Sequence, residues 1–241
     1  MKQLYILTGC SKGLGKALLD SLLENEEHHV VGISRSMMEE KERFVHVQLD
    51  LGNTSALIEA LPDIFPDGDF KKVVLINNAG WIGEIAPLGK LAPEGIAKIH
   101  AINVVAPAIL INAFVGKYAD KEVEKLVVNI SSGAAEKDID GWSGYSSSKS
   151  ALNRISGVAQ AESDLKGYNI NYFALAPGIV DTPMQEDIRS AKSVDFSGLE
   201  KFISFKSNNE LSSPEEVAKK VIYLMGNADK FKGVIQDVRK F

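Results

Sequence analysis

The chain has 241 residues, 45% of them hydrophobic, so it is long enough for one large domain with a full core. Its 27 basic residues are scattered among 32 acidic ones, with a net charge of −5, which argues against a nucleic-acid partner. The single cysteine, Cys10, excludes an internal disulfide framework and a multi-cysteine metal site. We therefore expect one domain over residues 1–241, a small-molecule partner, no nucleic acid and no metal.

The first strand-like run, LYIL at residues 4–7, is too short for a signal peptide or a membrane span. We therefore expect a cytoplasmic protein that does not enter a membrane. The run ends at a glycine-rich turn, after which apolar residues from Leu14 to Leu22 recur at helical spacing. This is the pattern of one strand followed by one helix.

Apolar runs continue to alternate with helical patterns along the chain. Strands are expected at residues 4–7, 29–34, 44–50, 72–78, 125–131, 169–176 and 233–238. Helices are expected at residues 54–65 and 93–118, from the stretch at 141–152, and from Ser213, where Pro214 and Glu216 mark a helix start. Strands rich in Val, Ile and Leu and separated by helices predict a doubly wound, Rossmann-type α/β fold with about seven parallel strands and helices on both faces. The looser segment at about 182–212 is expected to form a lid over a substrate.

The loop TGCSKGLG at residues 8–15 follows the first strand and opens the first helix. Gly9, Gly13 and Gly15 would let the backbone approach a pyrophosphate, and the free N–H groups of the helix start favour its charge. Ordinary turn glycines are the alternative interpretation. The second strand ends in Ser34-Arg35-Ser36, without the carboxylate that would hold a free ribose hydroxyl. Arg35 and Lys12 could instead hold a 2′-phosphate, which favours NADP(H) over NAD, unless both are solvated surface charges.

The stretch GWSGYSSSKSAL at residues 141–152 places Tyr145 and Lys149 four residues apart, on one face of a helix. Small residues surround the pair. By itself, such a pair is often an exposed pair on a helix surface without a catalytic role.

Together, TGCSKGLG, NNAG at 77–80, the asparagine of INVVAP, the serines of NISSG, YSSSK and APGIVDT resemble the motifs of the short-chain dehydrogenase/reductase family. The resemblance covers nearly the whole chain in the family's order. It implies a catalytic tetrad of Asn103, Ser132, Tyr145 and Lys149. Ser132 is preferred because it lies thirteen residues before the tyrosine, whereas Ser131 would point to the other face of the strand end.

The tetrad implies proton chemistry at a carbonyl. Hydride reduction leaves an alkoxide, and a phenol with an ordinary pKa near 10 exchanges protons poorly at neutral pH. Lys149 is expected to favour the phenolate of Tyr145, while Ser132 polarises the substrate oxygen. Pro107 cannot donate to the carbonyl of Asn103, so we expect a local kink and a freed carbonyl from which a water leads to Lys149. Mere helix irregularity is the alternative.

The resemblance also implies contacts to a nicotinamide dinucleotide. Asp50 would lie by the adenine, Asn78 and Ala79 by the ribose, and Thr182 and Ile179 by the nicotinamide. The residues expected to bind NADPH are Gly9, Ser11, Lys12, Gly13, Leu14, Gly15, Arg35, Asp50, Leu51, Asn78, Ala79, Gly80, Tyr145, Lys149, Pro177, Gly178, Ile179 and Thr182.

Trp81 and Trp142 are expected to rim the substrate pocket, with Met184 at the start of the lid. Aromatic and methionine side chains suggest an apolar, ring-bearing or dicarbonyl substrate, although ordinary lid packing would use them too. Within the family, the Trp-x-x-Tyr arrangement and the segment from MQEDIR to SSPE look most like sepiapterin reductase and the bacterial benzil reductases. Asp237 lies near the place where some relatives anchor a pterin.

We therefore expect an NADPH-dependent carbonyl reductase acting on aryl or vicinal dicarbonyl substrates. A sepiapterin-type pterin reductase and an NADP-dependent alcohol dehydrogenase working in oxidation are the alternatives. A non-catalytic regulator would be expected to lack one of the four catalytic residues, and none is missing. The resemblance further implies a homodimer or homotetramer, because the helices carrying Asn103 and Tyr145 often pair between subunits in this family.

Overall fold

The computed structural model describes residues 2–241, which form one parallel sheet in the order β3-β2-β1-β4-β5-β6-β7. The strands are β1 Gln3–Thr8, β2 His28–Ser34, β3 Phe44–Gln48, β4 Lys72–Asn77, β5 Glu124–Ile130, β6 Ile170–Ala176 and β7 Ile235–Asp237. The predicted doubly wound α/β fold is confirmed. The order reverses at β1, which pairs with β2 on one side and with β4 on the other, so the cleft beside this switch point is where such sheets bind ligands.

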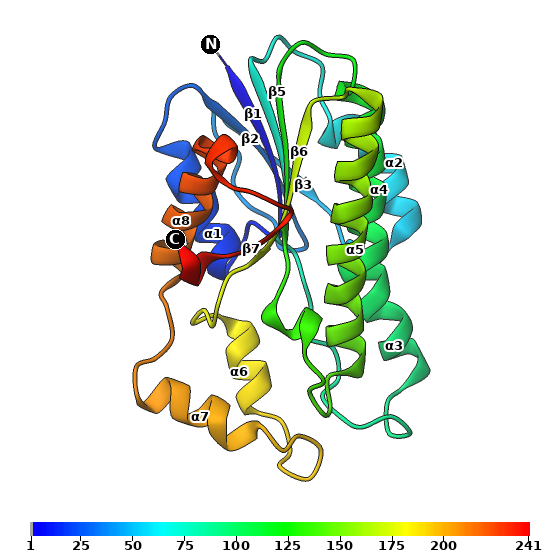
Figure 1. Cartoon of the computed structure of the whole chain (residues 1–241), viewed down its shortest axis with the longest axis vertical. Helices are drawn as coiled ribbons and strands as arrows, with labels where there is room; N and C mark the ends of the chain where they lie inside the picture. The colour runs from blue at the N-terminus through cyan, green and yellow to red at the C-terminus, as the bar shows by residue number, and fades with distance from the viewer. Residues whose placement is uncertain (1) are drawn as a thin grey trace.

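Helices cover both faces of the sheet (Figure 1). They are α1 Gly13–Leu23, α2 Thr54–Ile64, α3 Pro93–His100, α4 Ala106–Tyr118, α5 Ser143–Lys166, α6 Pro183–Arg189, α7 Leu199–Ser207 and α8 Pro214–Gly226. Tyr5 and Leu7 of β1 pack toward α1 and α8, whereas Leu4 and Ile6 pack toward α2 and α4. Successive residues of a strand point to opposite faces, so both faces of β1 are apolar.

Local sequence explains where several helices begin and end. Ser213 accepts a hydrogen bond from the Glu216 N–H, and the Glu216 carboxylate accepts one from the Ser213 N–H, which forms the capping box at the start of α8. Asn53 caps α2 in the same way through the Ala56 N–H. Gly167 ends α5 with φ of 69°, a left-handed conformation that glycine adopts without steric cost.

The expected long helix at 93–118 is continuous but irregular. Between α3 and α4, residues Ala101–Val105 form a π-helical turn, in which the Ala106 N–H donates to the Ala101 carbonyl. Pro107 has no N–H for the Asn103 carbonyl, so the regular α-helical pattern cannot pass through this point. The irregularity expected from Pro107 is therefore present, as a π-turn that carries Asn103. Over Pro93–Tyr118 this helix is long and apolar enough to cross a membrane by length and composition alone, and 44% of its most apolar window is buried within the protein.

The segment at 182–212 is more regular than its sequence pattern suggested, because it contains α6 and α7. Both helices lie beyond the carboxyl ends of the strands, at the lower end of the molecule in Figure 1. Asp140 holds the segment in place by accepting hydrogen bonds from the Ser197 N–H at 2.7 Å and the Ser197 hydroxyl at 2.8 Å. Lys90 adds an ion pair to Asp195 at 2.8 Å. The segment is thus tied to the loops on the opposite side of the cleft.

Candidate active site

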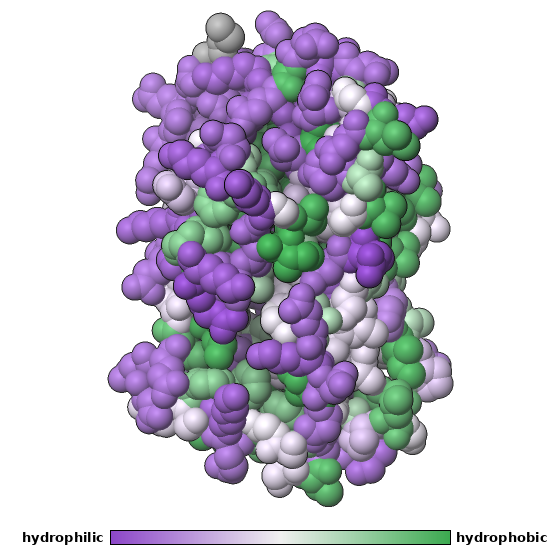
Figure 2. All heavy atoms as spheres, in the orientation of Figure 1, coloured by the Kyte–Doolittle hydropathy of each residue, from purple (hydrophilic) through white to green (hydrophobic). Residues whose placement is uncertain are grey.

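A cleft follows the carboxyl ends of the strands and is closed on one side by α6 and α7. Every residue expected from the sequence to bind the cofactor or substrate, or to belong to the tetrad, lines it, except Asn103, which lies behind Trp81. Hydrophilic side chains cover most of the face shown in Figure 2, with hydrophobic ones between them along its whole length.

The glycine loop is too crowded for side chains. A Cβ built on Gly15 would lie 2.0 Å from the Gly9 carbonyl oxygen, and one on Gly9 would lie 2.9 Å from the Ala79 Cα. Gly9 and Gly13 also have φ of 72° and 54°, which disfavour other residues. Lys12 precedes α1 and supplies no side-chain cap, so the first N–H groups of the helix are left for a ligand. The loop fits the pyrophosphate of a dinucleotide.

Thr8 and Asn78 hold this loop in shape. The Thr8 hydroxyl oxygen accepts the N–H groups of Asn78 and Ala79, both at 3.0 Å. The Asn78 amide donates to the carbonyls of Thr8 at 3.0 Å and Gly9 at 3.2 Å. The Asn78 side chain therefore holds the phosphate loop in shape, and its expected place beside the ribose stays a prediction. Thr8 was missed because its role depends on β4, which lies far along the chain.

Arg35 and Lys12 are both exposed at the edge of the cleft. The Ser34 hydroxyl donates to the Ser36 carbonyl at 2.8 Å and also contacts the His46 ring nitrogen at 2.9 Å, which fixes the turn that carries Arg35. Cys10 is buried, and burial raises the pKa of its thiol. This agrees with a packing role for the cysteine.

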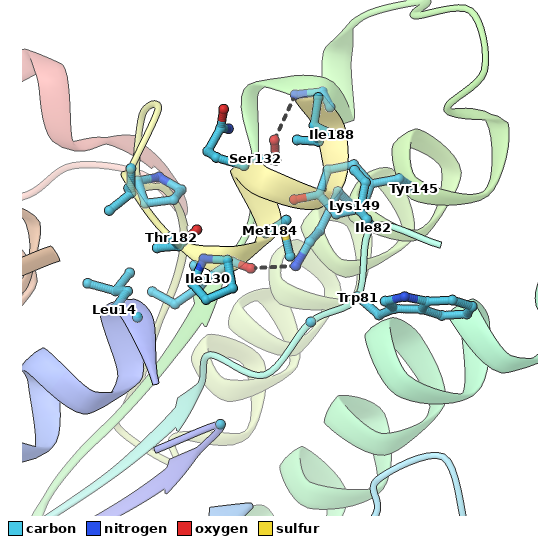
Figure 3. A pocket seen from close by; sticks show the side chains of 18 of the residues that line it. Leu14, Trp81, Ile82, Ile130, Ser132, Tyr145, Lys149, Thr182, Met184 and Ile188 are labelled. Atoms are coloured by element: carbon cyan, nitrogen blue, oxygen red, sulfur yellow. Dashed lines mark hydrogen bonds between the residues drawn. The ribbon is translucent and has the colours of Figure 1, made fainter. Parts of the chain in front are cut away.

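Three members of the expected tetrad meet at the centre of the cleft (Figure 3). Tyr145 and Lys149 lie one turn apart on α5, with the Lys149 Nζ 5.7 Å from the centre of the tyrosine ring. The Lys149 ammonium donates to the Ile130 carbonyl at 2.8 Å, at the end of β5. Ser132 hydrogen-bonds to the Tyr145 phenol. Ser131 turns the other way and donates to Asn153, so only Ser132 faces the tyrosine.

Asn103, the fourth member, reaches the site through its side chain. Its Oδ1 accepts the Trp81 N–H at 2.9 Å, and its Nδ2 donates to the Trp81 carbonyl at 2.9 Å and to the Ser148 hydroxyl at 3.0 Å. A Cβ built on Gly80 would lie 3.5 Å from the Lys149 Nζ and 3.7 Å from the Asn103 Oδ1. Asn103 and Lys149 therefore border one small space beside Gly80.

An aromatic layer lies next to Tyr145 on the side of α6 and α7. We define it as Trp142, Phe196 and Phe202. Phe196 stacks on the Trp142 indole at 5.5 Å and 25°, and Phe202 lies at 5.4 Å from it. The indole meets Tyr145 edge-on, with ring centres 5.6 Å apart. Trp142 is only 5% exposed, so it is a buried wall of the cleft and not its rim.

The other two expected pocket residues occupy different positions. Met184 packs against the cluster that contains the aromatic layer, from the first turn of α6. Trp81 also lines the cleft, but the Lys98 ammonium lies over its ring, 5.3 Å from the ring centre. Figure 3 shows the indole extending away from Thr182 and Leu14. Trp81 therefore flanks the site on the side of α3.

Asp237, near the place where some relatives anchor a pterin, is paired with Arg239 in this structure. Its carboxylate accepts from the Arg239 guanidinium, with Nη2 2.5 Å from Oδ2 and Nε 2.9 Å from Oδ1. These bonds hold the pKa of Asp237 below its ordinary value. Of the pair, Arg239 lines the cleft and Asp237 does not. Arg239 thus neutralises the charge of the Asp237 carboxylate in this structure.

The family model described as short chain dehydrogenase matches residues 3–193. The chain belongs to this family. A benzil reductase from Bacillus subtilis that forms (S)-benzoin is 32% identical, over 99% of this chain and 99% of its own. A sepiapterin reductase from Bos taurus is 28% identical, over 96% of this chain and 92% of its own. A solved short-chain dehydrogenase/reductase from Saccharomyces cerevisiae has a TM-score of 0.84 and 26% identity, covering 98% of this chain and 96% of that one. The resemblance inferred from the motifs is confirmed.

Short-chain dehydrogenases are oxidoreductases that use a nicotinamide dinucleotide, and burial shifts the pKa values of two groups in this site. Burial raises the pKa of Tyr145 to about 12, although its hydrogen bond with Ser132 acts in the opposite sense. Burial also lowers the pKa of Lys149 to about 8. Burial dominates the pKa of Tyr145, and the expected effect of the Lys149 charge on the phenolate stays a prediction. At neutral pH the phenol keeps its proton and can donate it.

Phe196 and Phe202 are the residues of this short-chain dehydrogenase that sequence reasoning missed in the substrate site. Both come from the segment DFSGLEKFISF, in which phenylalanines recur at residues 196, 202 and 205. That aromatic spacing was a usable signal for a packed layer. The spacing did not indicate which side chains would face Trp142, since Phe196 and Phe202 lie more than fifty residues after Trp142 in the chain.

Proposed function

We propose that this short-chain dehydrogenase is an NADPH-dependent carbonyl reductase of 1,2-diketones that carry an aryl or similar apolar group. The observation that carries the proposal is the aromatic layer of Trp142, Phe196 and Phe202, which lies directly beside the Tyr145 phenol. A substrate whose carbonyl reaches Tyr145 must place its neighbouring group against these rings. The similarity to a benzil reductase supports the same substrate class.

The choice of NADPH over NADH rests on the part of the cleft next to the glycine loop and the end of β2, where the adenosine would lie. Lys12 and Arg35 are exposed there, and the stretch Ser34-Arg35-Ser36 at the end of β2 contains no carboxylate that would repel a 2′-phosphate. Arg35 can meet a phosphate through two parallel N–H groups, and Lys12 adds a second positive charge.

The proposed roles of the tetrad follow from its geometry. A nicotinamide dinucleotide held by the glycine loop would supply the hydride for the carbonyl carbon. Tyr145 donates its proton to the carbonyl oxygen as that oxygen becomes an alcohol, and Ser132 donates a hydrogen bond that orients the same oxygen. The Lys149 ammonium, held by the Ile130 carbonyl, stabilises the phenolate that remains. A water in the space beside Gly80 would link Lys149 to Asn103 and return a proton to Tyr145.

The alternatives are less well supported. An alcohol dehydrogenase working in oxidation needs the phenolate as a base, whereas burial keeps Tyr145 protonated. A pterin reductase of the expected type needs a free carboxylate, whereas Asp237 is paired with Arg239. A non-catalytic regulator has no reason to keep all four members of the tetrad.

Two further expectations belong to the proposal. We propose that the protein is cytoplasmic and forms a homodimer or homotetramer through the helices that carry Asn103 and Tyr145. Val105, Val158 and Leu165 are exposed apolar side chains on α5 and beside α4, so contact between subunits there would cover them.

The test is the specificity constant kcat/KM for benzil, diacetyl, acetone and sepiapterin, measured through NADPH consumption. Covering ~100 Å² of an aryl group at about 25 cal/mol per Å² contributes roughly 2.5 kcal/mol, so benzil should exceed acetone by at least about tenfold. The same value for benzil and acetone would refute the aromatic substrate site. Sepiapterin far above benzil would favour the pterin alternative and make Asp237 the next residue to change.

A further inference from the structure

Two short segments that lie more than fifty residues apart in the chain meet beside the active site through paired contacts. The Asp140 carboxylate accepts hydrogen bonds from the N–H of Ser197 at 2.7 Å and from its hydroxyl at 2.8 Å. Two residues after Asp140, the Trp142 indole stacks on Phe196, with ring centres 5.5 Å apart. The six residues that meet here are called the latch: Asp140, Gly141, Trp142, Asp195, Phe196 and Ser197.

The middle of the latch requires a glycine. Gly141 has φ of 75°, a left-handed conformation that other residues adopt only at a cost. A Cβ built on Gly141 would lie 2.6 Å from the Asp195 carbonyl oxygen, which belongs to the backbone and cannot turn aside as a flexible side chain could. Any side chain at position 141 would therefore push the two segments of the latch apart.

The lid segment at 182–212 is fixed at its base and, separately, at the latch. At the base, the Ser212 N–H donates to the Ile179 carbonyl at 3.0 Å, and the Asp181 N–H donates to the Ser212 carbonyl at 2.9 Å. These bonds join the two ends of the lid and leave its middle to other contacts. The latch supplies such contacts, together with the ion pair between Lys90 and Asp195 at 2.8 Å.

The latch sets the distance between the lid and the aromatic wall of the active site. Trp142 meets Tyr145 edge-on at 5.6 Å, while Phe196 and Phe202 reach the indole from the lid. A gap of roughly 0.5–1 Å forfeits about a quarter to a half of the attraction between packed groups. A phenyl group held against these rings would lose this attraction if the latch opened, whereas a methyl group covers much less area and would lose little.

We propose that Asp140 and Gly141 are positioning residues that hold the aromatic layer closed around a phenyl group and so determine the preference for aryl over alkyl diketones. Both residues act through the stacked pair of Trp142 and Phe196. The inference rests on the proposed function, because it concerns the aryl substrates proposed there.

The test measures kcat/KM for benzil and for diacetyl with the wild-type protein, Gly141→Ala and Asp140→Ala. Both substrates are 1,2-diketones, and they differ in carrying phenyl or methyl groups. A smaller fraction of active protein lowers both values equally, so the ratio of benzil to diacetyl isolates the contact with the phenyl groups. The ratio should fall about three- to eightfold in both variants, with the value for diacetyl almost unchanged. A ratio that stays at the wild-type value in either folded variant would overturn the inference.

Each variant has a matched control. Gly233 has φ of 77°, but a Cβ built on it meets no atom within 4 Å, so Gly233→Ala adds the backbone strain without the clash. Asp138 is an exposed carboxylate that lines the same cleft outside the latch, so Asp138→Ala removes the same charge as Asp140→Ala. Both controls should keep the wild-type ratio. A fall in a control as large as in its latch variant would overturn the inference, because strain or charge alone would then explain it.

Asp140→Ala decides the question if Gly141→Ala does not fold, as judged by circular dichroism and cofactor binding, because it introduces no clash. Wild-type protein that does not prefer benzil to diacetyl would overturn the proposed function and this inference together. A wild-type preference for benzil that both latch variants retain would overturn the inference alone.

Discussion

The pH dependence of reduction should follow the charge on Lys149. Burial lowers the pKa of this ammonium to about 8 and raises the pKa of Tyr145 to about 12. A lowered pKa means that the positive charge is present below about pH 8 and is lost above it. Tyr145 keeps its proton throughout this range, so the lysine alone sets the profile. Reduction should be constant at lower pH and decline as the pH rises through about 8.

The size of the decline follows from the same pKa. About nine-tenths of the Lys149 side chains are charged at pH 7 and about one-tenth at pH 9, so kcat/KM should fall roughly tenfold between these values. The specificity constant is the quantity to measure, because it reports the pKa values of the free enzyme. Lys149→Arg should remove the decline, since a guanidinium stays charged above pH 12, even if the variant is slower.

Lys201 offers a matched control, because it lines the same cleft but is exposed. Lys201→Arg should leave the profile unchanged. A wild-type profile that is flat to pH 9.5, or a decline that persists in Lys149→Arg, would refute the link between burial of Lys149 and activity. Cofactor affinity measured across the same pH range separates the loss of the Lys149 charge from the titration of the 2′-phosphate of NADPH.

Three further predictions concern the cofactor and the proton path. Tyr145→Phe should leave the fold and cofactor affinity nearly intact and lower turnover at least about a hundredfold, and a variant that keeps a tenth of the rate would place the proton donor elsewhere. NADPH should bind at least about tenfold better than NADH, or ~1.4 kcal/mol, and Arg35→Asp should abolish this preference in a binding titration. If the ratio of the NADPH and NADH affinities is unchanged in this variant, Arg35 does not cause the preference for NADPH. Asn103→Ala should remove the side-chain oxygen that borders the space beside Gly80 and raise the solvent isotope effect on turnover; an effect that does not rise would contradict the water path.

The architecture could be predicted from the sequence, because strands and helices depend on patterns that are local in the chain. The apolar runs marked all the strands within a few residues, and a doubly wound parallel sheet followed from their alternation with helices. Pro107 also marked the irregular turn at Asn103, since a missing N–H has the same effect in any fold. The motifs named the family, and their spacing singled out Ser132, Tyr145 and Lys149, which the structure brings together.

The surroundings of these residues depend on contacts between segments that are far apart in the chain. Trp142 is a buried wall because Phe196 and Phe202 arrive from a distant segment, and Asn78 braces the glycine loop because β1 and β4 are neighbours. The pKa of Tyr145 is likewise a property of the folded site. Burial sets it, and burial is the sum of contacts from segments far apart in the chain, which no local pattern contains.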